Sequence, residues 1–197
     1  HELKLQPGDP TVYLIDGQPE KMVRREVSIL VRDAQGVMST RVHPVWSTRW
    51  GPVVIAPRAG LNWTATTAYA IQDANAGNLR SAATWLSFAA ARSVDDLREG
   101  MKNLGVPWVN TIAADRHGRA LYADLSVVPD VDAARLAACA PSPAAAALFR
   151  GAGLAVLDGS RAACDWQRDP ASPVPGLTPI ARMPVAVRTD WVQNSND

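Results

Sequence analysis

Residues 107–124 read PWVNTIAADRHGRALYAD, and this stretch decides the architecture that we expect. Two runs of strand-forming residues, 107–115 and 120–124, flank the turn Arg116-His117-Gly118-Arg119. A short, glycine-containing turn between two such runs is typical of a β-hairpin. The sequence therefore predicts antiparallel pairing here.

Further strands are expected upstream of this hairpin. Val27–Val31 supplies strand residues, Asp33–Gly36 has turn chemistry, and Val37–Val45 alternates apolar with polar side chains. We expect these two runs to pair antiparallel as another hairpin. Residues 53–55 and a strand within 61–71 indicate additional strands.

The first segment of the chain gives a different signal. Residues up to Pro19 are rich in turn formers, and a short apolar run there stops at an Asp-Gly turn, Asp16-Gly17. We expect this segment to be a connector.

Helices are predicted at several places between and after these strands. Apolar side chains recur at near-helical spacing over Asn78–Ala91, and Ser93 is placed to cap a second helix that follows directly. Shorter helices are expected at Val131–Ala138 and, with Ser142 as the cap, at Ala144–Phe149. Two consecutive helices are therefore expected after the strands that end near residue 71, and two short helices after the hairpin over 107–124.

The chain is expected to form one segment, residues 1–197, of an α+β fold with a mostly antiparallel sheet and packed helices. Within it we expect sheet and helices over 1–125 and a proline- and alanine-rich excursion over 126–183. Over 184–197 the chain is then expected to return to strand, with strands at 184–188 and 190–192.

Composition narrows the class of protein. The 197 residues are 47% hydrophobic and 20% charged, which predicts a globular protein with a sizeable core. The net charge is +1 and the basic residues are scattered, so we expect no nucleic-acid partner. No apolar stretch approaches the length of a membrane span.

The chain opens on His1 without an initiator methionine, and we expect it to be part of a longer polypeptide.

The two cysteines, Cys139 and Cys164, have two interpretations. They could form a disulfide, which we favour and which would indicate an oxidising compartment, or they could be two buried thiols. There is no Cys-x-x-Cys motif and there are only three histidines, so no metal site is expected.

Self-contained catalytic motifs are absent from the sequence. There is no nucleophile elbow, phosphate-binding loop or dinucleotide fingerprint. Single aspartates such as Asp115, Asp124 and Asp165 are more typical of turns and surfaces than of catalytic acids. The tail over 190–197 is more informative, because it carries amide side chains that never ionise and could donate to an oxyanion, although an Asx-rich turn would look the same.

Several runs, taken in order, carry a resemblance to a known family. They are Trp50–Val54, Tyr69–Ala70, Asp73–Asn75, Trp85, Pro107–Asp115, Gly118, Tyr122, Ser126–Pro129, Cys139, Cys164–Trp166 and Val192–Asp197. In this order and spacing the chain resembles the β-subunit of the penicillin amidase family, most closely the N-acyl-homoserine lactone acylases. The resemblance covers nearly the whole chain.

The resemblance implies an N-terminal-nucleophile hydrolase with a four-layer αββα sandwich and no cofactor. In that family a serine exposed by self-cleavage of a precursor zymogen attacks an amide carbonyl, with its own α-amine as the base. Asn196 matches the oxyanion asparagine of the family, and Asn194 is the alternative if the alignment is shifted by two residues. The nucleophile has no counterpart in this chain, so we expect the segment alone to be inactive.

The resemblance also implies an acyl-binding pocket. Trp108 and Val109 match positions that line it, and Trp85 matches a second pocket tryptophan; the alternative for each is an ordinary core side chain. The expected partners are the remaining β-subunit segments, the α-subunit of the same precursor and a small acyl amide, in a periplasmic or secreted setting. Hydrolysis of acyl-homoserine lactones would be quorum quenching. A non-catalytic module that binds apolar ligands through Trp46, Trp50 and Trp108 is the alternative function.

Overall fold

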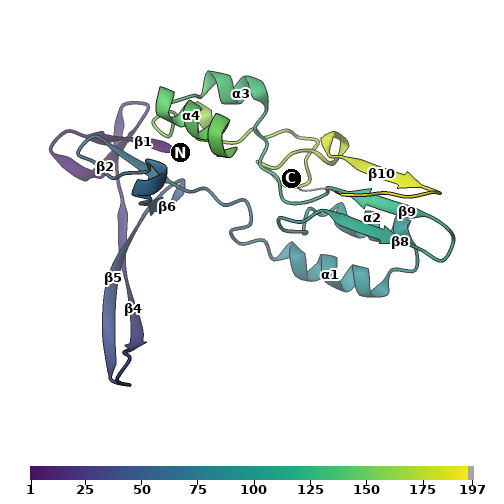
Figure 1. Cartoon of the computed structure of the whole chain (residues 1–197). Helices are drawn as coiled ribbons and strands as arrows, with labels where there is room; N and C mark the ends of the chain where they lie inside the picture. The colour runs from purple at the N-terminus through teal and green to yellow at the C-terminus, as the bar shows by residue number, and fades with distance from the viewer. Residues whose placement is uncertain (195–197) are drawn as a thin grey trace. The chain divides into compact units, whose positions relative to one another are not determined.

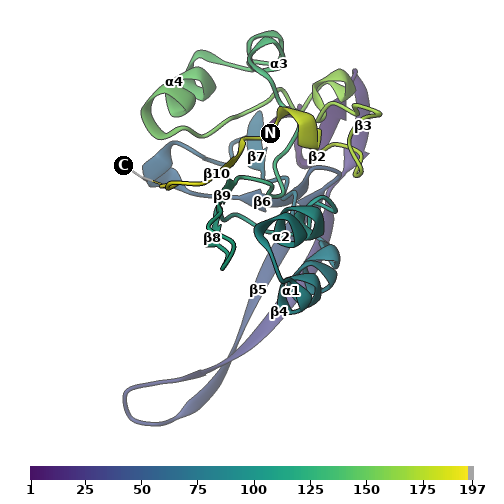
Figure 2. The ribbon, with the colours of Figure 1, turned by 90° about the vertical axis from the view of Figure 1, so that its right-hand side faces the viewer.

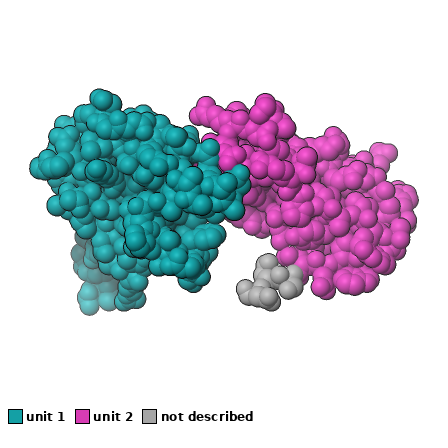
Figure 3. All heavy atoms as spheres, turned by 90° about the horizontal axis from the view of Figure 1, so that it is seen from above, with its two compact units in different colours: residues 1–73, 132–165 teal, residues 74–131, 166–197 magenta. Residues whose placement is uncertain are grey.

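The computed structural model describes residues 1–194 and has the predicted α+β class. It divides into two compact units, which Figure 3 shows in different colours. Unit 1 comprises residues 1–73 and 132–165, and unit 2 comprises residues 74–131 and 166–197. The expected excursion over 126–183 is therefore shared between the units. Within the described residues, no helix has the length and apolarity needed to span a membrane.

Unit 1 is built on a seven-stranded antiparallel sheet (Figure 1). The strand order is β3-β2-β1-β7-β6-β5-β4. The strands are β1 (Glu2–Gln6), β2 (Asp9–Ile15), β3 (Gln18–Lys21), β4 (Val23–Arg32), β5 (Met38–Thr48), β6 (Gly51–Val54) and β7 (Thr67–Ala70). A short 3₁₀ helix, η1 (Pro57–Ala59), lies between β6 and β7.

The expected connector at the start of the chain is wrong, because this segment forms β1, β2 and β3. Asp16 and Gly17 both have positive φ, 49° and 81°, as a two-residue hairpin turn requires, and they join β2 to β3. Leu3 and Leu5 alternate with exposed or half-buried residues and are buried in the core of unit 1. This alternation over five residues is short, and β1 gains its second partner only from β7.

The predicted upstream hairpin is confirmed as β4 and β5. Ten residue pairs join the strands, from Val23↔Ser47 to Arg32↔Met38. The carboxylate of Asp33 accepts hydrogen bonds from the backbone N–H groups of Gln35 and Val37, which closes the turn. Most side chains of this ribbon are exposed, and Figures 1 and 2 show it as a long two-stranded arm.

Strand β7 is shorter than the run that predicted it, whereas β6 begins at Gly51, two residues before the predicted run 53–55. The backbone at Gly51 has φ 120°, and a Cβ there would lie 2.1 Å from the carbonyl oxygen of Ile71. Only glycine therefore fits where β6 approaches the end of β7. β7 begins at Thr67, after the side chain of Thr64 has accepted hydrogen bonds from the backbone of Thr66 and Thr67 in a turn.

Unit 1 is completed by residues 132–165, which contain α3 (Ala133–Ala138), α4 (Pro143–Ala152) and the 3₁₀ helix η2 (Ala162–Cys164). Ser142 accepts a hydrogen bond from the backbone of Ala145, so the predicted N-cap of α4 is confirmed. The segment joins β1 through a parallel bridge between Glu2 and Asp158. The indole of Trp50 also donates to the carbonyl of Gly159 at 3.0 Å.

Unit 2 contains a three-stranded antiparallel sheet of order β10-β9-β8, together with α1 (Arg80–Ala90) and α2 (Val94–Met101). The strands are β8 (Thr111–Ala114), β9 (Ala120–Ala123) and β10 (Val185–Arg188), and η3 (Ile180–Arg182) precedes β10. The predicted hairpin is confirmed, with Thr111 opposite Ala123 and Ala114 opposite Ala120. Both predicted helices are also present.

The core of unit 2 lies between the helices and the sheet. Its fully buried members come from α2, β9 and the loops after each: Val94, Met101, Leu104, Val106, Leu121, Ala123 and Leu125. Ser93 caps α2 as predicted, since its hydroxyl accepts a hydrogen bond from the backbone of Asp96. The sheet and α2 thus form two layers that pack against each other.

The strand expected at 190–192 is not formed. The carboxylate of Asp190 accepts two hydrogen bonds from Arg188, both at 2.6 Å, and a third from the backbone N–H of Trp191. These contacts make a local turn that ends β10 at Arg188. The chain then continues to Asn194 without regular structure.

Candidate functional site

The residues expected to line an acyl pocket begin with a sharp turn in unit 2. The backbone N–H of Val109 donates to the carbonyl of Pro107 at 2.5 Å, so Trp108 occupies the centre of a three-residue turn. Trp108 is 77% exposed and Val109 is 49% exposed. The turn therefore presents two apolar side chains on the surface of unit 2, immediately before β8.

Trp85 is the second expected pocket tryptophan, and it lies on α1. It is 52% exposed and meets Phe88, one helical turn later, edge to face at a ring-centroid distance of 5.4 Å. Phe88 in turn packs against the core of unit 2. None of Trp85, Trp108 and Val109 belongs to either core cluster of the described residues.

A contact between distant amides adjoins the Trp108 turn. The side-chain N–H of Asn110 donates to the side-chain oxygen of Asn194 at 3.0 Å, across 84 positions of sequence. Asn194 is the alternative oxyanion candidate, and Asn110 directly follows Val109. The structure thus brings the tail of the chain to the segment that carries the apolar turn.

Asn196, the expected oxyanion donor, lies outside the described residues. Its role therefore remains a proposal. Asn194, two positions earlier, is exposed on unit 2.

A family model described as penicillin amidase matches residues 1–197 of this chain. The chain belongs to the penicillin amidase family.

Two relatives named as acylases are similar to the whole of this chain. Aculeacin-A acylase of Actinoplanes utahensis is 47% identical over 198 residues, and the acyl-homoserine lactone acylase PvdQ of Pseudomonas syringae pv. syringae is 41% identical over the same length. Each alignment covers 100% of this chain and 24% of the relative. The chain thus spans about a quarter of the length of these acylases.

Comparison with solved structures identifies the fold. A thermostable penicillin G acylase from Alcaligenes faecalis matches with a TM-score of 0.65 and 22% identity, over 95% of this chain and 28% of that protein. This likeness confirms that the chain has the N-terminal-nucleophile hydrolase fold that its sequence resembles.

The aspartates of this penicillin amidase segment have structural partners. Asp115 accepts hydrogen bonds from the backbone N–H groups of Val94, His117 and Arg119. Burial favours the neutral acid, but these backbone donors outweigh it and hold the pKa of Asp115 below its usual value. The carboxylate thereby ties the β8–β9 turn to the start of α2.

The other two candidate acids are also engaged. Asp124 accepts a hydrogen bond from the hydroxyl of Ser126 at 2.8 Å, and Asp165 accepts one from the side chain of Gln72 at 3.1 Å. These local contacts agree with the interpretation of the aspartates as turn and surface groups. Across residues 1–194, no group of three or more His, Cys, Asp or Glu side chains is arranged to hold a metal ion.

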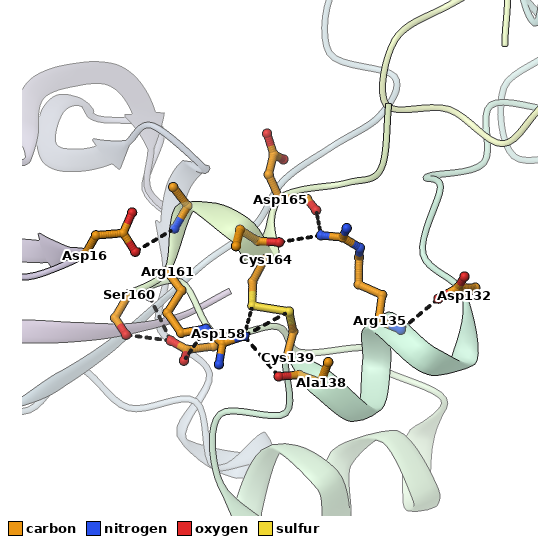
Figure 4. The surroundings of a disulfide bond; sticks show 12 residues. Asp16, Asp132, Arg135, Ala138, Cys139, Asp158, Ser160, Arg161, Cys164 and Asp165 are labelled. Carbon is orange, nitrogen blue, oxygen red and sulfur yellow. Dashed lines mark hydrogen bonds and ion pairs between the residues drawn. A yellow bond between two sulfur atoms is a disulfide. The ribbon is translucent and has the colours of Figure 1, made fainter. Parts of the chain in front are cut away.

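Cys139 and Cys164 form a disulfide in unit 1, with their Cα atoms 5.6 Å apart (Figure 4). It links the C-terminal end of α3 to η2. The guanidinium of Arg161 lies against the bond, 3.0 Å from the sulfur of Cys164, and donates to the carbonyl of Ala138. Arg135 donates to the backbone carbonyls of Ala163 and Asp165 from the other side.

The tryptophans that an apolar-ligand module would use are not equally free. Trp50 is 4% exposed, and its indole N–H is engaged by Gly159 within the core of unit 1. Trp46 is half-buried and meets Trp63 edge to face at 5.8 Å. Of the three, Trp108 alone presents most of its surface to solvent.

Proposed function

We propose that this chain is part of an amide hydrolase that deacylates N-acyl-homoserine lactones or related fatty amides. The observation that carries the proposal is the identity of 47% and 41%, over the entire chain, with two proteins named as acylases. The exposed Trp108 and Val109 support a fatty substrate, because each buried methylene of an acyl chain contributes about 0.8 kcal/mol to binding.

The proposed reaction uses a serine nucleophile outside this chain. Its hydroxyl adds to the amide carbonyl while its α-amine takes the proton, and the side-chain N–H of Asn196 donates to the oxyanion. The C–N bond then breaks, the amine leaves with the proton, and water hydrolyses the acyl-enzyme to release the fatty acid. This chain would contribute the oxyanion amide and one wall of the acyl pocket.

The remaining segments of the precursor are the proposed partners. The chain aligns with only about a quarter of each relative, so the nucleophile would come from another part of the same polypeptide. We also propose a periplasmic or secreted location. The Cys139–Cys164 disulfide supports it, because disulfides persist in oxidising compartments.

The full-length protein is the material for the test. It is incubated with a long-chain N-acyl-homoserine lactone, and the fatty acid and free homoserine lactone are quantified by mass spectrometry. We expect both products in equal amounts. Ring-opened lactone with an intact amide, or binding without turnover, would contradict the proposal, and the latter would favour the non-catalytic module.

Trp108 gives a prediction about specificity. Trp108→Ala in the full-length enzyme is expected to change the ratio of kcat/KM for long over short acyl chains roughly tenfold, because contact with about two methylenes is lost. The measurement is kcat/KM across a series of acyl lengths. Leu30→Ala, an equally exposed apolar side chain of β4, serves as the control. An unchanged profile for Trp108→Ala would show that its exposed surface does not contact the acyl chain.

A further inference from the structure

We propose that Asn110 is a positioning residue for the oxyanion amide and acts through its hydrogen bond to Asn194. The inference rests on the proposed function, in which Asn196 supplies an oxyanion donor. Asn110 itself need not touch substrate. Its part would be to fix the backbone of the tail from which Asn196 extends.

Asn110, the donor of this hydrogen bond, adjoins the sheet of unit 2. Asn110 directly precedes β8, whose first residue, Thr111, is paired with Ala123 of the central strand β9. Ala123 is fully buried in the core of unit 2, and β9 is paired on its other side with β10. Asn110 therefore directly precedes a strand that is paired with the central strand of the sheet.

The tail is held at a second place, just after β10. The Arg188 guanidinium donates two hydrogen bonds to Asp190 and holds the pKa of that carboxyl well below its usual range. The pair therefore stays ionised across the pH range of an ordinary assay. Asp190 also accepts from the backbone of Trp191, which fixes the direction in which the chain leaves β10.

These two restraints frame the end of the described chain. The Asp190 turn holds its start, and the amide pair holds Asn194. Asn196 follows two residues later, and an extended chain covers at most about 7 Å over that span. Because an oxyanion donor acts only within about 3 Å of the developing charge, a loose tail would spread its amide over positions that do not stabilise the transition state.

The Asn110–Asn194 hydrogen bond, here called the clamp, joins two groups that suit a permanent contact. Neither amide ionises, so the contact does not depend on pH, unlike an ion pair. Asn110 also lies in the segment PWVN with the apolar Trp108 and Val109. The same stretch of backbone would thus present the acyl wall and hold Asn194.

The test uses four variants of the full-length enzyme: Asn110→Ala, Asn194→Ala, Asn196→Ala and the double variant Asn110→Ala/Asn196→Ala. We expect Asn110→Ala and Asn194→Ala each to lower kcat about three- to tenfold, as loss of one neutral hydrogen bond predicts. KM, acyl-length preference and melting temperature should not change. The double variant should have the kcat of Asn196→Ala, because a clamp has no effect once the group it positions is gone.

Asn62→Ala is the matched control, since Asn62 is also an exposed amide with a local hydrogen bond, but in unit 1. It should leave all parameters unchanged. Asn194→Ala removes the same hydrogen bond from its acceptor side, so a folding defect specific to Asn110→Ala would appear in only one of the two variants.

The outcomes separate the inference from the proposed function. Wild-type kcat for Asn110→Ala and Asn194→Ala, together with a large loss for Asn196→Ala, would overturn the inference alone. An Asn110→Ala loss that adds fully to that of Asn196→Ala would overturn it too, because the effect would not pass through the tail. Wild-type kcat for Asn196→Ala would overturn the oxyanion assignment and the inference together.

Discussion

Asn196→Ala in the full-length protein is expected, from the proposed function, to lower kcat about 100- to 1,000-fold, which corresponds to ~3 kcal/mol of transition-state stabilisation. A preorganised amide donor contributes most when negative charge develops on the carbonyl oxygen, so the loss should fall on kcat and leave KM nearly unchanged. The measurement is steady-state turnover of a long-chain acyl-homoserine lactone, normalised to the concentration of active nucleophile.

Two companion measurements make this result specific. The melting temperature and the acyl-length profile of Asn196→Ala should match the wild-type enzyme, because in the proposed role the amide acts only on the charge that develops in the transition state. Asn194→Ala tests the alternative alignment. If the loss of 100-fold or more appears in Asn194→Ala while Asn196→Ala remains active, Asn194 is the donor and the proposed clamp does not exist.

The elements that could be predicted are those specified by local chemistry. The turn of Asp33 and the N-caps Ser93 and Ser142 each satisfy backbone groups within four residues, so a short window of sequence contains the whole reason for the structure. The hairpins β4–β5 and β8–β9 follow for the same reason.

The β2–β3 hairpin was missed although its turn, Asp16-Gly17, is a local signal, whereas β1 depends on a distant partner. β1 is a strand because Leu3 pairs with Ala68, far along the chain, and its five residues carry too little periodicity to show this alone. The missing strand at 190–192 is the opposite case, since hydrogen bonds to the side chain of Asp190 compete with strand pairing. Residues 2–6 and residues 190–192 are both so short that their sequence is compatible with a strand and with irregular structure.

The candidate site shows the same division. Resemblance assigned Trp108 and Val109, and the turn Pro107–Val109 explains why apolar side chains are exposed there. The Asn110–Asn194 contact was missed, because nothing local connects positions 84 residues apart. The sequence did contain a signal that Asn110 could make a tertiary contact, because this polar amide lies between the apolar residues of PWVN and a strand.

Removal of the disulfide, by Cys139→Ser together with Cys164→Ser, is expected to destabilise unit 1 by about 3 kcal/mol. The bond closes a loop with a sequence separation of 25 residues, and in the chain-entropy model its loss frees that loop chiefly in the unfolded state. The closed segment carries α4 and the backbone contacts of residues 157–160 with Glu2 of β1 and with Asp16 of the β2–β3 turn. Opening it should therefore expose backbone groups at the start of β1 and at the β2–β3 turn.

Loss of the disulfide should increase opening of residues 132–165 before it affects unit 2. Hydrogen exchange measured on the full-length double variant should show faster exchange for peptides within residues 132–165, whereas those covering β8 and β9 of unit 2 should keep wild-type rates. A reducing agent should produce the same change in the wild-type protein and none in the double variant. If exchange within 132–165 stays at the wild-type rate, the contacts of Glu2, Asp16 and Trp50 with that segment, rather than the covalent link, hold it in place.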